Sequence, residues 1–124
     1  MAAADSSSLI AYFAGETGAD IDALRSALLA SDLFVPPAAL AEFLSDPELP
    51  DLHRSHVTAL SMLEPMPGYW HRIGATRAVI LKRGLKARLA DAMIAQSCID
   101  ADMVLIQRDG DFRHFAKYCG LKLA

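Results

Sequence analysis

Residues 89–106 read LADAMIAQSCIDADMVLI, and this stretch decides the fold because it predicts a helix that leads into a strand. The helix opens at Asp91, an acid ahead of an apolar run, and is expected to end near Asp100. The following Met103–Ile106 is a continuous apolar run too short for a helix, so it predicts a buried strand. Helices alternating with buried strands are typical of an α/β fold with a mostly parallel sheet.

Two further apolar runs predict strands of the same sheet. Met1–Ala4 leads into Asp5 and three serines, which predicts a strand followed by a capped helix. Leu33–Val35 stops at two prolines, and the second proline suits the first turn of a new helix. A last short strand is expected over Leu121–Leu123. Helices are expected over residues 9–13, 20–31, 38–44, 51–63, 69–83 and 112–118.

The composition is that of a single packed domain spanning residues 1–124. The apolar fraction is 53%, enough for a core, and helical spacing directs Leu29, Leu52 and Trp70, among others, toward it. A net charge of −3 gives no global attraction to nucleic acid. Cys98 and Cys119 form no metal or disulfide pattern, so reduced thiols of a cytoplasmic protein are expected. Neither a secretion signal nor a membrane span is predicted.

Five acids fall where an α/β sheet gathers side chains. Asp5 follows the first strand, and Asp109 and Asp111 follow the strand quoted above, so parallel strands deliver them to one edge. Glu42 lies on the helix after the second strand, and Asp91 opens a helix whose dipole would hold its carboxylate ionised. Each alone fits an ordinary N-cap, turn or solvated residue. Together, close carboxylates repel by up to about 4 kcal/mol per pair unless a cation such as Mg²⁺ binds them.

The acid-bearing segments resemble the motifs of PIN domains. In chain order they read DSSSLI at 5–10, AEF at 41–43, LADAMIA at 89–95 and LIQRDGDF at 105–112, followed by GLKL at 120–123. Their order and the chain length are similar to those of VapC toxins of bacterial toxin–antitoxin pairs. The resemblance spans nearly the whole chain and implies a PIN-like three-layer α/β/α fold with a short, mostly parallel central sheet.

The resemblance further implies a Mg²⁺-dependent endoribonuclease, with Mn²⁺ as a substitute metal. Asp5, Asp91 and either Asp109 or Asp111 would bind the metal. Glu42 would orient the attacking water or act as a base, and the metal would offset charge on the phosphate. The choice between Asp109 and Asp111 stays open, because the second matches the family motif and the first lies nearer the strand end.

Two residues would support this site. Ser7 would steady it by hydrogen bonds. Gln107 stands where the family usually has Thr or Ser, and its longer side chain needs more room in the loop. This departure keeps one alternative open, a PIN-fold module that binds RNA or an antitoxin but cleaves weakly. A phosphohydrolase acting on small phosphate esters is a second alternative, although the sequence has no Gly-rich phosphate loop.

A basic segment precedes Asp91 in the chain. Its members are Arg72, Arg77, Lys82, Arg83, Lys86 and Arg88. They form either a solvated helix face or a phosphate track leading to the acids, and single-stranded or loop RNA, as in tRNA or rRNA, is the accessible target. The resemblance also implies a cognate antitoxin and a homodimer, for which apolar residues of the early helices would supply surface. No catalytic or zinc-binding role is assigned to His53, His56, His71 and His114.

Overall fold

The computed structural model describes every residue from Met1 to Ala124. Its elements are, in chain order, β1 (Ala2–Ala4), α1 (Ser6–Phe13), α2 (Ala19–Leu29), β2 (Leu33–Val35), α3 (Pro37–Leu44), α4 (Asp51–Thr58), β3 (Ser61–Met62), α5 (Tyr69–Leu81), α6 (Leu89–Asp100), β4 (Val104–Ile106) and α7 (Arg113–Cys119). The four strands form one parallel sheet in the order β3-β2-β1-β4. None of the helices is long and apolar enough to cross a membrane.

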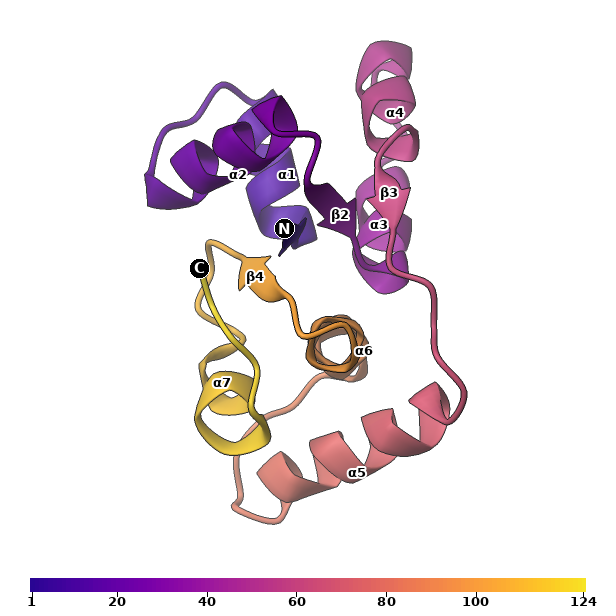
Figure 1. Ribbon diagram of the computed structural model, residues 1–124, viewed down its shortest axis with the longest axis vertical. Coiled ribbons are helices and arrows are strands. Elements are labelled where there is room, and N and C mark those ends of the chain that lie inside the picture. The colour runs from indigo at the N-terminus through magenta and orange to yellow at the C-terminus, as the bar shows by residue number, and fades with distance from the viewer.

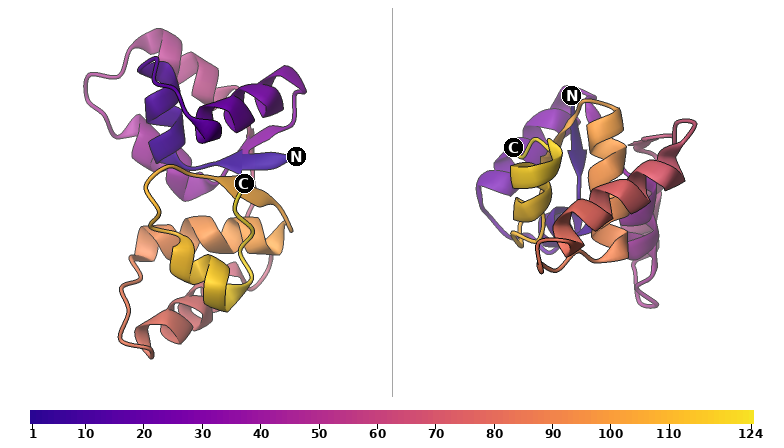
Figure 2. Two further views of the ribbon diagram at one scale, coloured as in Figure 1. Left: turned by 90° about the vertical axis from the view of Figure 1, so that its left-hand side faces the viewer. Right: turned by 90° about the horizontal axis from the view of Figure 1, so that it is seen from below.

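The sheet separates two groups of helices (Figures 1 and 2). α1 and α2 lie on one side of it, whereas α5, α6 and α7 lie on the other, so the domain has three layers. α3 packs against both α1 and α6 and therefore joins the two groups at one edge of the sheet. The expected α/β/α architecture is confirmed, with strands that are all parallel.

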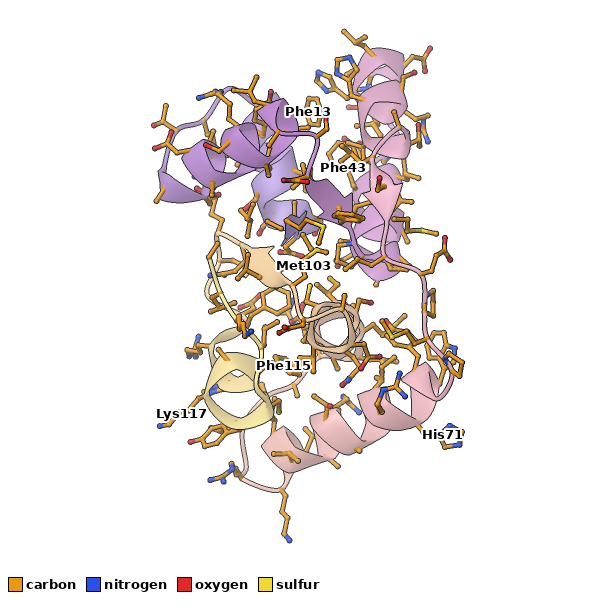
Figure 3. All side chains as sticks on the ribbon, viewed as in Figure 1. Phe13, Phe43, His71, Met103, Phe115 and Lys117 are labelled. Atoms are coloured by element: carbon orange, nitrogen blue, oxygen red, sulfur yellow. The ribbon has the colours of Figure 1, made fainter.

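The core fills the space between the sheet and its helices. β1 consists of three alanines, and Ala3 and Ala4 are fully buried because a central strand is covered on both faces. Small side chains there let the helices approach the sheet closely. On the other side, Phe115 of α7 points toward α6, and Met103 lies between α6 and the sheet (Figure 3). Phe112, which directly precedes α7, is also fully buried and anchors the end of the preceding loop.

Two elements differ from the sequence prediction. The helix expected over residues 51–63 ends at Thr58, and Ser61–Met62 pair with β2 as the edge strand β3. Both residues of β3 are exposed, so they give no hydrophobic pattern from which a strand could be predicted. The strand expected over Leu121–Leu123 is reduced to a single parallel bridge between Leu105 and Leu123.

Four large apolar side chains expected in the core are exposed instead. Leu29 is 83%, Leu52 64%, Trp70 63% and Leu81 45% exposed. In α5 the buried aromatic residue is Tyr69, whose hydroxyl donates to the carbonyl oxygen of Met93 at 2.6 Å. These helices carry more apolar residues than they have positions facing the core. Helical spacing alone therefore does not determine which face of α5 is buried.

Candidate metal-binding acid site

The carboxyl ends of β1 and β4 lie side by side at the centre of the site. The strand order reverses between them, since the chain moves from β1 to β2 and β3 on one side and returns to β4 on the other. In open parallel sheets, ligands bind outside the carboxyl ends of the strands at such a point. Asp5 directly follows β1, and its amide donates to the carbonyl oxygen of Ile106, the last residue of β4, at 2.9 Å. Residues 107–111, here called the acid loop, therefore open beside Asp5.

Asp5 is a buried carboxylate, 3% exposed, that caps the start of α1. The Ser7 hydroxyl donates to its Oδ2 at 2.7 Å, and the Ser7 amide donates to the same oxygen at 3.4 Å. Burial raises the pKa of Asp5, the bonds from Ser7 partly oppose that increase, and the charge of Asp109 raises the pKa further. Ser7 thus orients a buried acid that forms no salt bridge.

Asp91 lies in the first turn of α6, where Arg88 occupies the N-cap position. Burial is the largest cause of a pKa of Asp91 raised from 3.8 to about 6. The negative charges of three other acids add to this increase, namely Asp111, Asp5 and Glu42, whereas Arg88 opposes it. Burial and neighbouring charges thus outweigh the helix dipole in setting this pKa, although a group with a pKa of about 6 is still mainly ionised at neutral pH.

Glu42 is an exposed acid on α3 at the border of the site. The Ser6 hydroxyl donates to its Oε1 at 3.3 Å, which places this carboxylate over the start of α1. Because α3 packs against both α1 and α6, it brings Glu42 between the helix starts that carry Asp5 and Asp91.

The acid loop is ordered by its own side chains. Gln107 Oε1 accepts the amide hydrogen of Gly110 at 2.8 Å, and Asp109 Oδ1 accepts that of Asp111 at 3.1 Å. Gly110 has φ of +75°, in the left-handed region that favours glycine. The long side chain at position 107 thus fits the loop and supplies a hydrogen bond that orders it.

A salt bridge that the sequence analysis missed anchors this loop to the other side of the sheet. Arg108 Nε and Nη2 donate to the two carboxylate oxygens of Asp20 at 2.9 Å each, and Nη2 also donates to the carbonyl oxygen of Thr17 at 2.7 Å. The Ser8 hydroxyl donates to Asp20 at 2.9 Å, and the bonds from Arg108 lower the pKa of Asp20. The Arg108 amide donates to Ser7 Oγ at 3.3 Å. This Arg108–Asp20 clamp fixes the loop to α2.

The five predicted acids lie near enough to one another for their charges to interact. Asp109 raises the pKa of Asp5, and Asp111 raises that of Asp91, so the acid loop presents one carboxylate to each helix start. As placed, no three acid, histidine or cysteine side chains converge as a metal-ion site. The donor set fits a hard divalent cation, because carboxylate oxygens are its preferred ligands and neither Asp5 nor Asp91 forms a salt bridge.

The predicted basic segment does not form one continuous track. Arg72 pairs with Asp100 at the carboxyl end of α6, with Nη2 and Oδ2 2.6 Å apart. The guanidinium of Arg83 lies over an aromatic ring, 4.0 Å from its centroid. Only Lys86 and Arg88 lie beside the acids, in a pocket that they share with acid-site residues.

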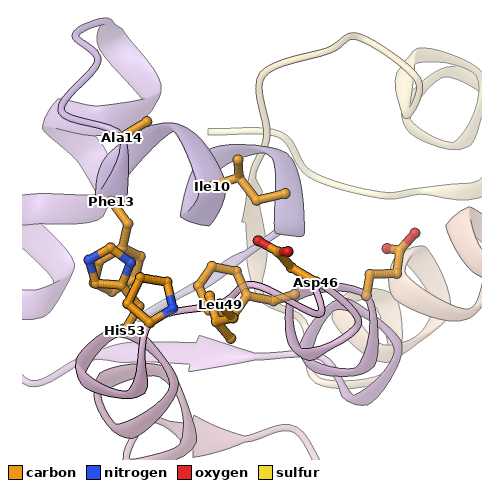
Figure 4. A pocket seen from close by; sticks show the side chains of 9 residues that line it. Ile10, Phe13, Ala14, Asp46, Leu49 and His53 are labelled. Carbon is orange, nitrogen blue, oxygen red and sulfur yellow. The ribbon is translucent and has the colours of Figure 1, made fainter.

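An apolar groove runs along α1 next to Glu42 (Figure 4). Its first part has a volume of about 250 Å³. Ile10, Leu49 and His53 face this part, and Phe13 lies close to His53, with ring centroids 4.6 Å apart. A neighbouring pocket shares Phe13 and is lined mainly by apolar residues of α1 and α2, among them Leu9, Tyr12, Leu24 and Leu28. We call these two pockets the α1 groove.

Fold and site together define an α/β domain that gathers carboxylates at the carboxyl edge of a parallel sheet. The PIN domain family model matches residues 2–118, and the chain belongs to this family, whose members are in general nucleases. Among solved structures, the chain is similar to one in the crystal structure of VapBC2 from Rickettsia felis bound to a DNA fragment from their promoter, with a TM-score of 0.75. The two are 17% identical, over 98% of this chain and 96% of that chain, so this likeness concerns the fold. A search of curated proteins found no match.

Proposed function

We propose that this protein is a Mg²⁺-dependent endoribonuclease and the toxin of a type II toxin–antitoxin pair. The gathering of carboxylates around Asp91 carries the proposal, because burial and the charges of Asp111, Asp5 and Glu42 together raise the pKa of this acid to about 6. Such crowding is unfavourable without a cation, and a bound Mg²⁺ or Mn²⁺ would remove the repulsion. The acids lie at the sheet edge where ligands bind in this class of fold.

The acids have two roles in the proposed hydrolysis. Asp5, Asp91 and either Asp109 or Asp111 would hold the cation, which when bound would supply charge to activate water and to offset charge on the phosphate. Exposed Glu42 would orient the attacking water and accept its proton. The water oxygen forms a new bond to phosphorus in line with the ribose oxygen, whose bond to phosphorus breaks. The departing ribose oxygen takes up a proton from solvent and leaves as a hydroxyl group. Ser7 acts by orienting the Asp5 carboxylate, and Gln107 acts by ordering the acid loop through the hydrogen bond that it accepts from the Gly110 amide.

We further assign the α1 groove to a cognate antitoxin. The groove is apolar, borders Glu42 and contains the half-exposed Ile10, so an amphipathic segment would bury apolar surface there. The structurally similar chain comes from VapBC2, a toxin–antitoxin complex. Exposed apolar residues of α5, with Trp70 the most exposed, are the surface that we assign to a homodimer.

The nuclease proposal is tested by incubating the purified protein with total cellular RNA in the presence of Mg²⁺, Mn²⁺ or EDTA and looking for cleavage. We expect discrete metal-dependent cuts that Asp91→Asn abolishes. Asp102→Asn is the matched control, since this acid is 81% exposed and pairs only with Lys122. A folded wild type that binds RNA or antitoxin but makes no cuts would favour the binding module. Cleavage competed by small phosphate esters rather than by RNA would favour the phosphohydrolase.

A further inference from the structure

Three basic side chains converge beside the acid site without forming a salt bridge. Lys86 and Arg88 lie just before α6, and Arg113 is the first residue of α7. They line a pocket of about 210 Å³ together with Ala87, Asp91, Asp111 and His114. Lys86 and Arg88 donate no side-chain hydrogen bond, and Arg113 donates to the carbonyl oxygen of Gly110 at 3.2 Å.

Cations held together in a pocket repel one another and therefore favour an anionic ligand. Other basic side chains close to acids are already paired, as Arg72 is with Asp100 and Arg108 is with Asp20. This pocket instead contains three cationic side chains and two carboxylates. Both carboxylates, those of Asp91 and Asp111, belong to the proposed cation site. A ligand that reaches it must therefore bring negative charge of its own.

We propose that this pocket binds the phosphate next to the scissile bond of single-stranded RNA. The inference rests on the proposed function, because it takes the scissile phosphate to lie at the acids. Since Asp91 and Asp111 form one wall of the pocket, a strand that passes over them brings its next phosphate to the three cations. The guanidinium groups of Arg88 and Arg113 suit phosphate oxygens, and Lys86 adds a point charge. A single strand can bend into such a recess, whereas a duplex holds its phosphates in a fixed helical array.

The subsite predicts a preference for bonds inside a chain. A substrate that ends at the scissile bond leaves the pocket empty and loses the contact. Cleavage inside an RNA chain is therefore favoured over removal of nucleotides from the chain end that would lie at the pocket.

Salt-dependent binding of a short, fluorescently labelled single-stranded RNA of mixed sequence tests the subsite. Anisotropy is measured in EDTA for the wild type, Lys86→Ala and Arg88→Ala. Arg54→Ala is the matched control, since it removes an exposed, unpaired cation from α4. Loss of one phosphate contact should lower the slope of log K against log[salt] by about 0.7 and weaken binding about fivefold near 0.1 M salt. Arg54→Ala should leave both unchanged.

Slopes for Lys86→Ala and Arg88→Ala equal to that of the wild type would overturn the subsite, as would a wild type that does not bind the RNA. A second probe carries one neutral methylphosphonate linkage beside the cleaved bond. It should weaken wild-type binding but have less effect on Arg88→Ala, because the same contact is already lost. If RNA binds with the expected slopes but is not cut with Mg²⁺, the nuclease proposal fails and the subsite stands. If RNA is cut but the slopes are equal, the nuclease stands and the subsite fails.

Discussion

Asp91→Asn should make the metal-free protein more stable at neutral pH. The carboxylate is half-buried among like charges, and its pKa of about 6 lies above the value of 3.8 expected in the unfolded chain. That difference corresponds to at most about 3 kcal/mol. Solvent screening of a half-buried group and the lost attraction to the helix dipole reduce the expected gain to about 1 kcal/mol. A chain of this size should then unfold about 4 °C higher.

The gain should depend on pH with a defined sign. Below about pH 4 Asp91 is protonated in both folded and unfolded wild type, so the two proteins should be equally stable. As the pH rises through 6, the folded wild type loses the stability that its protonated Asp91 contributes, and the difference should reach its plateau. Mg²⁺ at ten times its Kd should stabilise the wild type by about 1.4 kcal/mol and Asp91→Asn by much less.

Thermal unfolding in EDTA between pH 4 and 8, repeated with Mg²⁺ at neutral pH, measures these effects. Asp100→Asn is the matched control at the other end of α6, where Arg72 lowers the pKa of the carboxylate. It should destabilise the protein by about 1 to 2 kcal/mol, the opposite sign. A metal-free Asp91→Asn that is less stable than the wild type at neutral pH would refute the crowding argument.

Substitutions at Arg108, Gln107 and Ile10 test the loop and the groove. Arg108→Ala removes both hydrogen bonds to Asp20, so isothermal calorimetry should show an Mg²⁺ affinity reduced about tenfold. Arg108→Lys should have an intermediate affinity, because a lysine lacks the paired donors. An unchanged affinity would exclude a positioning role for Arg108. Gln107→Leu leaves a loop amide without its acceptor, so RNA cleavage should fall about tenfold. Gln107→Thr should stay close to wild type, and a large increase would instead mean that Gln107 weakens the enzyme. Ile10→Asp places a charge in the α1 groove, so antitoxin binding measured by calorimetry should weaken about 100-fold while RNA cleavage persists. Leu29→Asp, on α2 outside the groove, is its control, and an equal loss there would argue against the assigned surface.

The sequence was most informative where chemistry and topology act together. Short apolar runs before Asp5 and Asp109 predicted parallel strands, and the rule that ligands bind at their carboxyl ends then brought distant acids together. Pro37 and Gly120 correctly marked a helix start and a helix end. These features depend on local geometry, so a single sequence carries them.

The features missed depend on how elements pack. Arg108 and Asp20 are 88 residues apart, and nothing local relates their charges. Tyr69 rather than Trp70 is buried because its hydroxyl donates a hydrogen bond to the carbonyl oxygen of Met93 on α6. Helical spacing cannot indicate this contact. The pKa of Asp91 likewise reflects burial first and then three acids from other elements, so its raised value emerges only in the folded domain.

Because of the Arg108–Asp20 clamp, α2 contributes to both the α1 groove and the acid loop. The helix supplies Leu24 and Leu28 to the α1 groove, and through Asp20 it holds the acid loop. Under the proposed function, a mutation that shifts α2 enough to weaken antitoxin binding should also loosen the loop that carries two of the proposed metal-binding carboxylates. Escape from the proposed antitoxin and loss of the proposed activity would then be coupled, which would limit how far this surface can change in evolution without a matching change in its partner.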